Sequence, residues 1–576
     1  MKRLPYPKTT VSIICLFFVL LGLQAILKSP STPTSTSASS TVTSPETKSS
    51  ETSFAEDKRV YASHDGNRLE HVYVTVFDQK SVPENDITLY DLNESYKQYS
   101  NLESGPKLFV HFESGDAEGP DSLNLFDDAT VNATIELRGR SSRLEPQKSY
   151  KIRLQDSAGL WYGQSVLNLN KHVDDRTRVR NRLAFAYYEQ LDDISSLRTN
   201  FVQLHVRDMT DPSQADEFVS YGLYTHVEQL NEEALSARGL NPDGHLYKAE
   251  NFEFHRYPDA LKAKDDPTYD KKTFESVLKI NGSDNHEELL TMLDDLNDLS
   301  KPFDEVFDTY FDEDNYLTWL GTNILFGNYD TMSTNYYLYS PLNSEKWYFM
   351  PWDFDKALGR DTERTDVMPS WQQGVQRYWG TVLHRRYLKD PDHVEALKTK
   401  MEELTRVINA DNTKRLIDGF YPVVAPLVTS EPDIRFLSVE AKDYATSYRT
   451  LENITSKYYK DFIRSLENPM PIFLNHAREG KQDVFRWDAS YDIQNDELRY
   501  HFELSKSPDF STLVTEKQNM TTFSQSIPSL DPGRYYWRVT VTDAEGNTQI
   551  PFDYYRDNDR TMHWGVQQIV IPGAKP

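Results

Sequence analysis

The chain has 576 residues, 38% of them apolar and 12% aromatic, so it is long enough for more than one globular core. Its 89 acidic and 63 basic residues give a formal net charge of −26, which argues against nucleic acid and anionic membrane surfaces as partners because both are polyanions. Cys15 is the single cysteine, so an intrachain disulfide and a cluster of thiolate metal ligands are excluded.

An apolar run over residues 11–27 follows the basic residues Lys2 and Lys8 near the start of the chain. This run is just long enough to cross a bilayer and has a poor small-residue cleavage site, so we expect residues 1–28 to form a transmembrane signal anchor. Secretion after cleavage of this segment is the alternative. The positive-inside rule places the rest of the chain outside the cytoplasm. Residues 29–57 are rich in Ser, Thr and Pro and predict a disordered linker.

Alternating apolar and polar residues predict a series of strands in the first half of the chain. The expected strands are 71–77 and 107–112, which begin a mixed sheet, and then 131–138, 149–154, 200–206 and 220–227. A turn rich in arginine, residues 139–146, separates the third strand from the fourth. Residues 174–191 carry apolar side chains at helical spacing, so we expect a helix between the fourth and fifth strands.

A stretch in the middle of the chain carries an ordered set of acidic and amide side chains. Residues 314–326 have apolar side chains at helical spacing, and a helix there would deliver Asp330 to a fixed place just beyond its end. Asn335 follows five residues later in the same loop. The sequence therefore predicts a loop of the form Asp-x4-Asn at the end of a helix.

An aromatic hairpin comes next, followed by a second acidic loop. The expected strands of the hairpin are residues 336–339 and 347–350, and the loop after them carries Asp353 and Asp355. Helix, Asp-x4-Asn loop, hairpin and second aspartate is the layout of a protein-kinase catalytic centre. Phosphoryl transfer needs divalent cations held by hard oxygen ligands and one carboxylate aimed at the nucleophile. A capping role for any one of these aspartates is the competing interpretation.

The motifs GNYD-x4-NYYLY and W-x3-PWDFD resemble the signature of the CotH family, atypical kinases named after spore-coat protein H. Upstream, the blocks ELRGRSSRLEPQKSYKIRL, RNRLAFAYYEQL, YGLYTHVEQL and HLYKAE are similar to other blocks of that family and occur in the same order. The resemblance covers roughly residues 130–360. It implies a kinase that uses ATP with Mg2+ or Mn2+ and that phosphorylates protein hydroxyls.

The resemblance also implies a role for each residue of the central stretch. Asp330 would orient the acceptor hydroxyl, and Asn335 and Asp353 would hold metal. Asp355 would bind a second ion or stabilise the loop. It stands where an ordinary D-F-G has glycine, so switching by inversion of this loop is not expected. Lys148 would contact phosphate, because the likeness centres on the K-S-Y step.

Other side chains are candidates for contacts with the nucleotide. Lys151 is the rival of Lys148, because residues three apart on a strand face opposite sides. The basic turn would place Arg140 and Arg143 over the phosphates. The remaining candidates are Glu228, at the connection between lobes, and the aromatic residues Tyr247 and Trp347. Stacking of a base on these two rings competes with the interpretation that they fill the core.

The second half of the chain is helical at first and then changes character. Helices are expected at residues 285–299, 391–420 and 438–466. Beyond residue 470, regularly spaced strands are expected at 484–487, 498–505, 524–527, 533–542 and 567–571. The V-F-x-W step and PGRYYWRV in this part resemble a fibronectin type III module, whose expected role is binding or spacing.

The sequence thus predicts an α+β fold with a two-lobed atypical protein-kinase-like domain at 58–470, an all-β fibronectin type III-like sandwich at 471–576 and an N-terminal transmembrane helix. The favoured function is a membrane-anchored kinase with its catalytic domain extracytoplasmic, acting on a protein substrate on or outside the cell envelope. The alternative is a catalytically weak or inactive CotH-like surface adhesin or binding protein whose C-terminal module binds a surface or matrix ligand. A carbohydrate hydrolase is a weaker alternative, because Asp353 and Asp355 show no acid–nucleophile separation.

Overall fold

The computed structural model of the chain describes residues 56–62, 67–98, 105–121, 130–342, 344–360 and 368–573. These residues belong to one unit, Thr52–Pro576. The expected membrane segment, 1–28, and nearly all of the expected linker, 29–57, lie outside the described residues. Among the described residues, none of the helices has the length and apolar character needed to span a bilayer.

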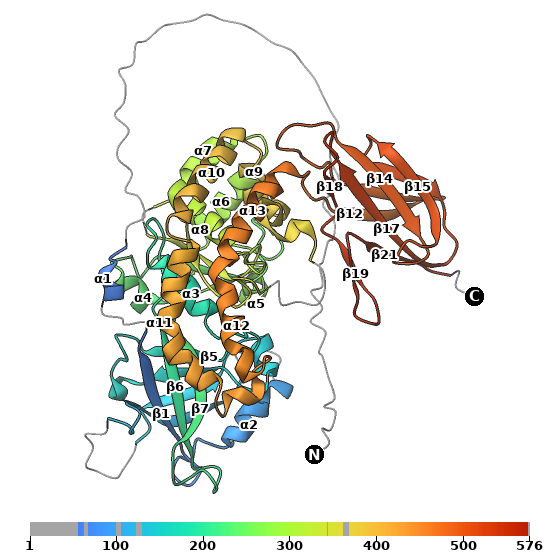
Figure 1. The fold of residues 1–576 in the computed structure, drawn as a ribbon. Coiled ribbons are helices and arrows are strands. Elements are labelled where there is room, and N and C mark those ends of the chain that lie inside the picture. The colour runs from blue at the N-terminus through green and yellow to red at the C-terminus, as the bar shows by residue number, and fades with distance from the viewer. Residues whose placement is uncertain are drawn as a thin grey trace, which may run out of the picture. The chain divides into compact units, whose positions relative to one another are not determined.

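Seven strands close into a barrel in the order β1-β2-β3-β4-β5-β7-β6 (Figure 1). Their bounds are β1 Leu69–Val76, β2 Lys107–Gly115, β3 Ala133–Leu137, β4 Tyr150–Leu154, β5 Val166–Asn170, β6 Thr199–Asp208 and β7 Val219–Glu228. β1 and β6 are parallel and the other neighbours are antiparallel, so the expected mixed sheet is confirmed. The closure of the sheet into a barrel was not predicted. Strand β5 was not predicted either, because it is short and places asparagines among its apolar residues.

Alternate residues of the strands fill the inside of the barrel. Residues such as Val74, Val110, Ile135, Ile152 and Leu204 are fully or almost fully buried and form one core cluster. The period-2 alternation of strands explains this arrangement, since every second side chain faces the same side. Short helices lie along this part of the chain: α1 Arg59–Ala62, α2 Leu89–Glu94, α3 Arg180–Tyr188 and α4 Glu232–Ala237.

Helix α3 is shorter than the helix predicted over 174–191. Arg178 has φ 61°, in the left-handed region that a right-handed helix cannot include. The carboxylate of Asp175 accepts hydrogen bonds from the backbone N–H groups of Thr177 (2.8 Å) and Arg180 (3.0 Å). Residues 175–179 therefore form a turn in front of the helix.

A second, smaller sheet has the strand order β11-β10-β8-β9 and is surrounded by helices. Its strands are β8 His245–Ala249, β9 Leu278–Ile280, β10 Tyr336–Ser340 and β11 Tyr348–Pro351. The helices up to the hairpin are α5 Lys271–Glu275, α6 Glu287–Asn297, α7 Phe303–Tyr310 and α8 Glu313–Leu325. The expected hairpin and the helices expected at 285–299 and 314–326 are confirmed.

The helices after the hairpin are more divided than the sequence pattern suggests. They are α9 Val382–Tyr387, α10 Pro391–Thr405, α11 Ala410–Val428, α12 Tyr444–Arg449 and α13 Ile454–Glu467. The single helix expected over 391–420 is two helices, because Asn409 has an extended backbone and its side chain caps α11 by accepting from the N–H of Asn412 (2.9 Å). α11 packs against β7 and α3 (Figure 1).

A buried ion pair fastens the helical region to the barrel. Asp433 lies beyond α11, and its carboxylate is 2.8 Å from the ammonium of Lys171, which follows β5. The same carboxylate accepts hydrogen bonds from the amide of Gln147 (2.9 Å) and the backbone N–H of Leu223 (2.7 Å). Side chains of Asp433 and Lys171 are 2% or less exposed, so removing one partner would leave a buried charge uncompensated.

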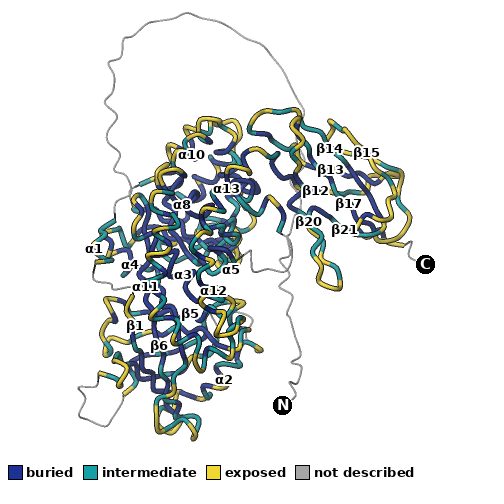
Figure 2. Tube along the Cα trace, in the orientation of Figure 1, coloured by how far each residue is buried: buried dark blue, intermediate teal, exposed yellow. Residues whose placement is uncertain are grey.

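The C-terminal part is all-β, as expected. It contains a three-stranded sheet, a larger sheet and a two-stranded ribbon, and the strands are β12 Leu474–Glu479, β13 Gln482–Trp487, β14 Arg499–Ser505, β15 Leu513–Met520, β16 Ser524–Pro528, β17 Gly533–Thr542, β18 Thr548–Gln549, β19 Tyr554–Arg556, β20 Met562–Trp564 and β21 Gln567–Ile571. Phe485, Phe502 and Trp537 belong to its own buried core (Figure 2). Its likeness to a fibronectin type III module stays a prediction.

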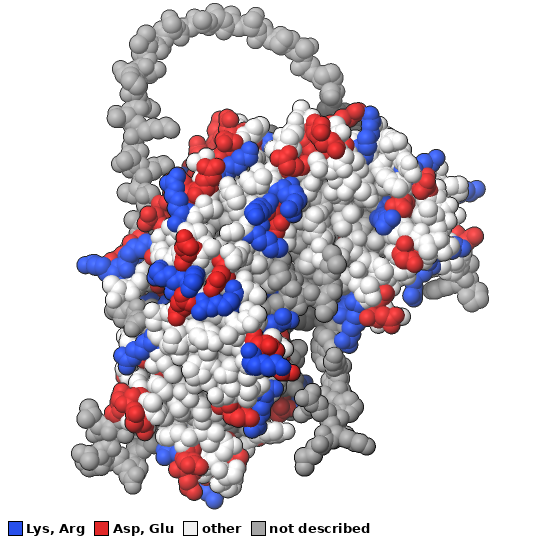
Figure 3. Space-filling view, viewed as in Figure 1, with Lys and Arg blue, Asp and Glu red and all other residues white. Residues whose placement is uncertain are grey.

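The C-terminal sheets contact the helical region through aromatic side chains. Trp371 lies edge-on to Phe552 with ring centroids 5.1 Å apart, and its indole N–H donates to the carbonyl of Pro551 (3.1 Å). Trp379 stacks on Tyr491 at 5.4 Å. Figure 3 shows acidic and basic side chains interspersed over the face in view, without one large basic patch. Such a surface does not resemble a polyanion-binding face.

Candidate active site

Helix α8 carries the first acidic loop and is anchored at both ends. Asp312 caps its start by accepting from the N–H of Asn315 (2.8 Å), and all of its residues from Asn315 onward are buried. Gly327 follows the end of α8 with φ 55°, and a Cβ added there would meet the ring of Tyr458 at 2.2 Å. Only glycine fits at this turn, which directs the chain from the helix into the loop of Asp330.

Asp330 and Asn335 are joined directly within this loop. The side-chain amide of Asn335 donates to the carboxylate of Asp330 (2.9 Å) and to its backbone carbonyl (3.1 Å). Both donors of the amide are thereby used, and its oxygen remains as the group that could coordinate a cation. Asn335 has φ 62°, a backbone conformation that costs energy and is concentrated at functional sites.

The hairpin leads to the second acidic loop, and a phenylalanine of that loop packs against helix α3. Phe354 is fully buried and packs on Phe185 and Tyr188 of α3, with ring centroids 5.3 Å away in both cases. Asp353, just before it, has φ 58°. Burial of Phe354 holds the aspartates on either side of it in the half-buried positions that they occupy. The expectation that the loop does not invert stays a prediction.

The three carboxylates of the two loops repel one another. Burial, and then the charge of Asp353, raise the pKa of Asp330. Burial and the charge of Asp355 raise the pKa of Asp353. Burial raises the pKa of Asp355, and so does the charge of Asp330, although Lys356 opposes this. We name Asp330, Asn335, Asp353 and Asp355 the acidic cluster; mutual repulsion of this kind is relieved when a cation is bound.

Basic groups from the barrel and the small sheet face the acidic cluster. Arg138, directly after β3, donates to the amide oxygen of Asn168 (3.1 Å) and to that of Asn170, and its guanidinium lies 5.6 Å from the ring of Trp352. Its positive charge favours the ionised form of Asp353, as does that of Lys248. His172 acts in the same direction when it is protonated, but burial lowers its own pKa to about 4. Two elements far apart in the sequence thus supply cations to one carboxylate.

The structure separates the two lysines that compete for the phosphate-contacting role. The ammonium of Lys148 donates to the carbonyls of Arg143 and Glu145 (both 2.7 Å) and lies 4.2 Å from the ring of Tyr96. The charges that act on it are those of Glu94, Glu145 and Lys97, none of which belongs to the acidic cluster. Lys148 is therefore not brought to the predicted site.

Lys151 is a residue of β4 and has different neighbours from Lys148, which precedes that strand. It stands opposite Glu136 of β3 and Asn168 of β5 in the sheet, and Arg138 is one of the charges that lower its pKa to about 8, after burial and Arg153. Since Arg138 acts on Asp353, Lys151 is the lysine of the pair that lies near the predicted site. The expectation that the two lysines face different sides agrees with this arrangement.

Glu228 is held in a buried ion-pair network with two arginines. At the end of β7 its carboxylate is 2.5 Å from the guanidinium of Arg198 and 2.5 Å from that of Arg238, and the side chain is 1% exposed. These arginines outweigh burial and lower the pKa of Glu228 to about 2. Gln229, the next residue, accepts from the amide of Asn168 (3.3 Å).

Tyr247 and Trp347 fill the core instead of lining an open site. Tyr247 is fully buried, and its hydroxyl lies 2.8 Å from Nδ1 of His286. Trp347 is 1% exposed, and its ring lies 5.9 Å from that of Tyr247. A base could stack on either ring only after the core had opened. On β8 the neighbour of Tyr247, Lys248, points to the opposite side, which is why Lys248 acts on Asp353.

Of the two candidate arginines of the basic turn, Arg140 lies at the surface and Arg143 is buried. Arg140 is largely exposed and forms an ion pair with Glu250 (2.8 Å), a residue that also pairs with Lys248 (3.0 Å). Arg143 is 8% exposed, and burial lowers its pKa. Glu250 therefore links Arg140 to Lys248, one of the basic groups that face the acidic cluster. The role of both arginines in phosphate binding stays a prediction.

Some groups near the acidic cluster were not predicted. Arg377 is half-buried and favours the ionised form of Asp330, as does Lys356 directly after the second loop. Lys248 lies in the HLYKA block and Arg138 ends the expected strand just before the arginine-rich turn, so a signal existed for both. Arg377, 47 positions after Asp330, carries no sequence signal that links it to that residue.

Acidic loops that hold an Asp, an Asn and two further carboxylates, faced by basic groups from a β-barrel, are the parts that a phosphoryl-transfer site requires. The sequence model of the CotH kinase protein family matches residues 135–465, which is more than half of the chain. The chain belongs to this family.

Comparison with known proteins finds a similar curated protein and partly similar solved structures. Inner spore coat protein H of Bacillus subtilis (strain 168) is 24% identical over 311 residues, which cover 52% of this chain and 79% of the relative. Among solved structures, the Helicobacter pylori proinflammatory kinase CtkA is 10% identical with a TM-score of 0.24, over 55% of this chain and 95% of its own. The HipA, HipB and operator DNA complex of Shewanella oneidensis MR-1 is 10% identical with a TM-score of 0.21, over 52% and 59%. Scores this low do not establish a common fold.

Proposed function

We propose that the protein is an atypical kinase that transfers the γ-phosphoryl group of ATP to a protein hydroxyl. The observation that carries this proposal is the acidic cluster: three mutually repelling carboxylates and an amide from two loops, opposite Arg138, Lys151 and Lys248. Membership of the CotH kinase protein family supports it, since that family implies the use of ATP and a divalent metal ion.

The acidic cluster fits divalent metal ions. Carboxylate and amide oxygens are the ligands that Mg2+ and Mn2+ accept, and half-buried carboxylates with raised pKa values gain from a nearby cation. Among the described residues, the three aspartates are not a group whose oxygens all lie within 4.8 Å of one another. We therefore assign Asn335 and Asp353 to one ion and Asp355 to a second. Bound metal would neutralise charge on the phosphates and on the transferred group.

Asp330 performs the positioning step. The hydrogen bonds from Asn335 hold its carboxylate in place, and the acceptor hydroxyl would donate to that carboxylate. As the hydroxyl oxygen bonds to the γ-phosphorus, the bond from phosphorus to the β,γ-bridging oxygen breaks and ADP leaves. The hydroxyl proton passes to Asp330 and then to solvent. Arg138 and Lys151 would contact the phosphates from the side of the barrel.

The substrate is proposed to be a protein on or outside the cell envelope. The support is the expected orientation of the N-terminal segment, which lies outside the described residues, and the printed name of the relative, a spore coat protein. The composition, with its net charge of −26, supports the exclusion of nucleic acid.

The test is phosphoryl transfer from γ-labelled ATP by the full chain, with Mg2+ or Mn2+ and a mixture of envelope proteins as acceptor. We expect transfer that EDTA abolishes and that Asp330→Asn lowers by about 10²-fold or more. Asp308→Asn, which changes an exposed carboxylate on α7, is the matched control and should retain activity.

One result would replace this proposal with the adhesin alternative. It is a folded, full-length chain that binds no nucleotide with either metal and transfers no phosphate, yet attaches to cells through residues 471–576. Binding of MgATP without transfer to any acceptor would also contradict the proposed activity.

A further inference from the structure

A second group of carboxylates lies in the C-terminal sheets, remote in sequence from the acidic cluster. Asp492 and Asp496 belong to the connection between β13 and β14, and Asp543 follows β17. One oxygen from each of the three lies within 4.8 Å of the others. Two oxygens that are each about 2.4 Å from a shared Ca2+ can be at most about 4.8 Å apart, so the spacing suits this ion.

The backbone is shaped to bring these carboxylates together. The N–H of Asn495 donates to the carbonyl of Asp492 (3.1 Å), and Asn495 has φ 64°, so the connection turns sharply between the two aspartates. The N–H of Asp496 donates to the Oδ1 atom of Asp492 (3.0 Å). The turn at Asp543 is closed by Asn547, whose backbone N–H (2.8 Å) and side-chain amide (2.9 Å) donate to its carboxylate.

One carboxylate oxygen of Asp492 has no partner among the described residues. The residue is 4% exposed, and its Oδ2 atom is buried with no hydrogen-bond partner among the described residues. Asp543 is 6% exposed. No lysine, arginine or histidine of the described residues forms an ion pair with any of the three carboxylates. A buried, unpaired carboxylate is costly, and the cost is removed when a cation supplies the missing charge.

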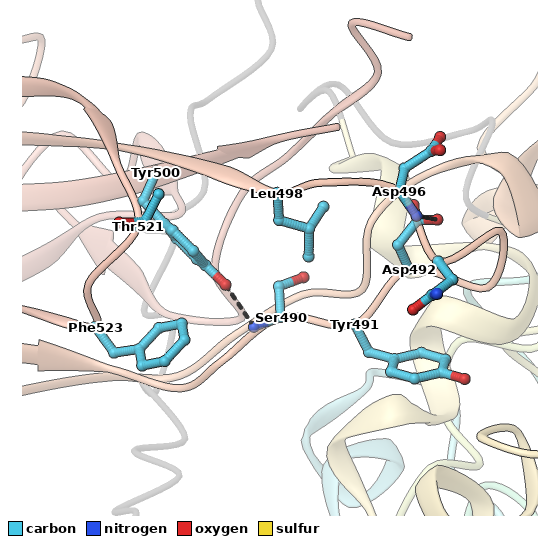
Figure 4. A pocket seen from close by; sticks show the side chains of 9 residues that line it. Ser490, Tyr491, Asp492, Asp496, Leu498, Tyr500, Thr521 and Phe523 are labelled. Carbon is cyan, nitrogen blue, oxygen red and sulfur yellow. Dashed lines mark hydrogen bonds between the residues drawn. The ribbon is translucent and has the colours of Figure 1, made fainter. Parts of the chain in front are cut away.

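Solvent can reach the same place. A cavity of about 270 Å³ is lined by Asp492, Asn495 and Asp496 together with residues of the sheet that include Tyr500 and Phe523. Figure 4 shows the two aspartates at one end of this cavity and Phe523 at the other, with Ser490 and Leu498 between them. Ca2+ takes six to eight oxygen ligands, and water from the cavity can complete a set that begins with three carboxylates.

We propose that Asp492, Asp496 and Asp543 form a Ca2+ site. The site lies on the two turns that hold the end of helix α13. The amide of Gln494 donates to the carbonyl of Leu466 (3.1 Å), and the amide of Asn547 donates to that of Glu467 (3.2 Å). Bound Ca2+ fixes both turns at once and so stiffens the junction between the C-terminal sheets and the helical region.

The first test is calorimetric titration of the full chain, cleared of metal with EDTA, with CaCl2. We expect a saturable binding event that becomes at least tenfold weaker in Asp492→Asn and in Asp543→Asn. Glu497→Gln removes the neighbouring exposed carboxylate, which is paired with Arg499 at 2.6 Å, and should bind Ca2+ like the unchanged chain. Equal Ca2+ affinity in all four proteins would overturn the assignment. Tighter binding of Mg2+ than of Ca2+ in the binding event that Asp492→Asn and Asp543→Asn weaken would overturn it as well.

A second measurement decides the matter even if the variants fold poorly. Amide hydrogen exchange of the unchanged chain should slow on addition of Ca2+ in residues 490–497 and 543–549. Unchanged exchange in both segments at saturating Ca2+ would refute the site. Phosphoryl transfer is measured separately with Mg2+, so an inactive protein that binds Ca2+ at these turns contradicts the proposed kinase and leaves this proposal standing.

Discussion

Replacement of Asp353 by asparagine should have opposite effects in the absence and in the presence of MgATP. Burial and the charge of Asp355 raise the pKa of Asp353, against the attraction of His172, Arg138 and Lys248. A carboxyl whose pKa is raised by folding destabilises the folded protein progressively as the pH rises above its unfolded value. At pH 7 in EDTA, Asp353→Asn should therefore be at least as resistant to unfolding as the unchanged chain.

With ligand the order reverses. At a ligand concentration of 100 times Kd, binding stabilises the folded state by about 2.7 kcal/mol. For a cooperative unit of about 400 residues with an unfolding entropy of about 2.1 cal/mol/K per residue, this corresponds to a rise in Tm of about 3 °C. Asp353→Asn loses a charged metal ligand, so its Tm should not move at the same MgATP concentration.

The assay is thermal unfolding followed by tryptophan fluorescence, in EDTA and with increasing MgATP or MnATP. Asp174→Asn is the matched control: its carboxylate lies 3.7 Å from Lys356, is 56% exposed and should leave the rise in Tm intact. Two results would refute the reasoning. One is a rise in Tm of Asp353→Asn equal to that of the unchanged chain, and the other is a marked loss of stability of this variant in EDTA, which would show a structural role.

Three further predictions follow from the described contacts. Lys151→Met should weaken MgATP binding at least tenfold in a fluorescence titration, whereas Lys148→Met should not. Weaker MgATP binding by Lys148→Met than by Lys151→Met would restore Lys148 as the phosphate contact. The pKa of Glu228 is lowered to about 2, so its carboxylate contributes on the order of 3 kcal/mol of stability, which is present above about pH 4.5 and lost as the pH falls toward 2. Glu228→Gln should be less stable than the unchanged chain at pH 7, and its acid unfolding curve should lack this pH-dependent loss. A chain ending at Met470 exposes Trp371 and Trp379, so it should aggregate more than the full chain, as measured by gel filtration. A soluble, fully active truncated chain would show that the C-terminal sheets are not needed to cover these residues.

The sequence by itself determined most of the elements and the residues of the acidic cluster. Strand alternation located β1–β4, and the spacing of apolar residues located α6 and α8, because these patterns depend only on which face of an element is buried. The Asp-x4-Asn loop and the D-F-D loop were predicted from their order around a hairpin. Local hydrogen bonds join Asp330 to Asn335, so short-range sequence carried that information.

Only the tertiary structure decided which basic groups serve the acidic cluster. Lys148 and Lys151 are equivalent in the sequence, but the pairing of β4 with β3 places Lys151 near Arg138, whereas Lys148 lies over Tyr96. Glu228 has the composition of a functional carboxylate, yet Arg198 and Arg238, which come from separate segments, turn it into a buried ion pair. The physical reason is the same in each case. A charge takes its role from the partners that packing places beside it, and in these cases the partners lie ten or more residues away in the chain.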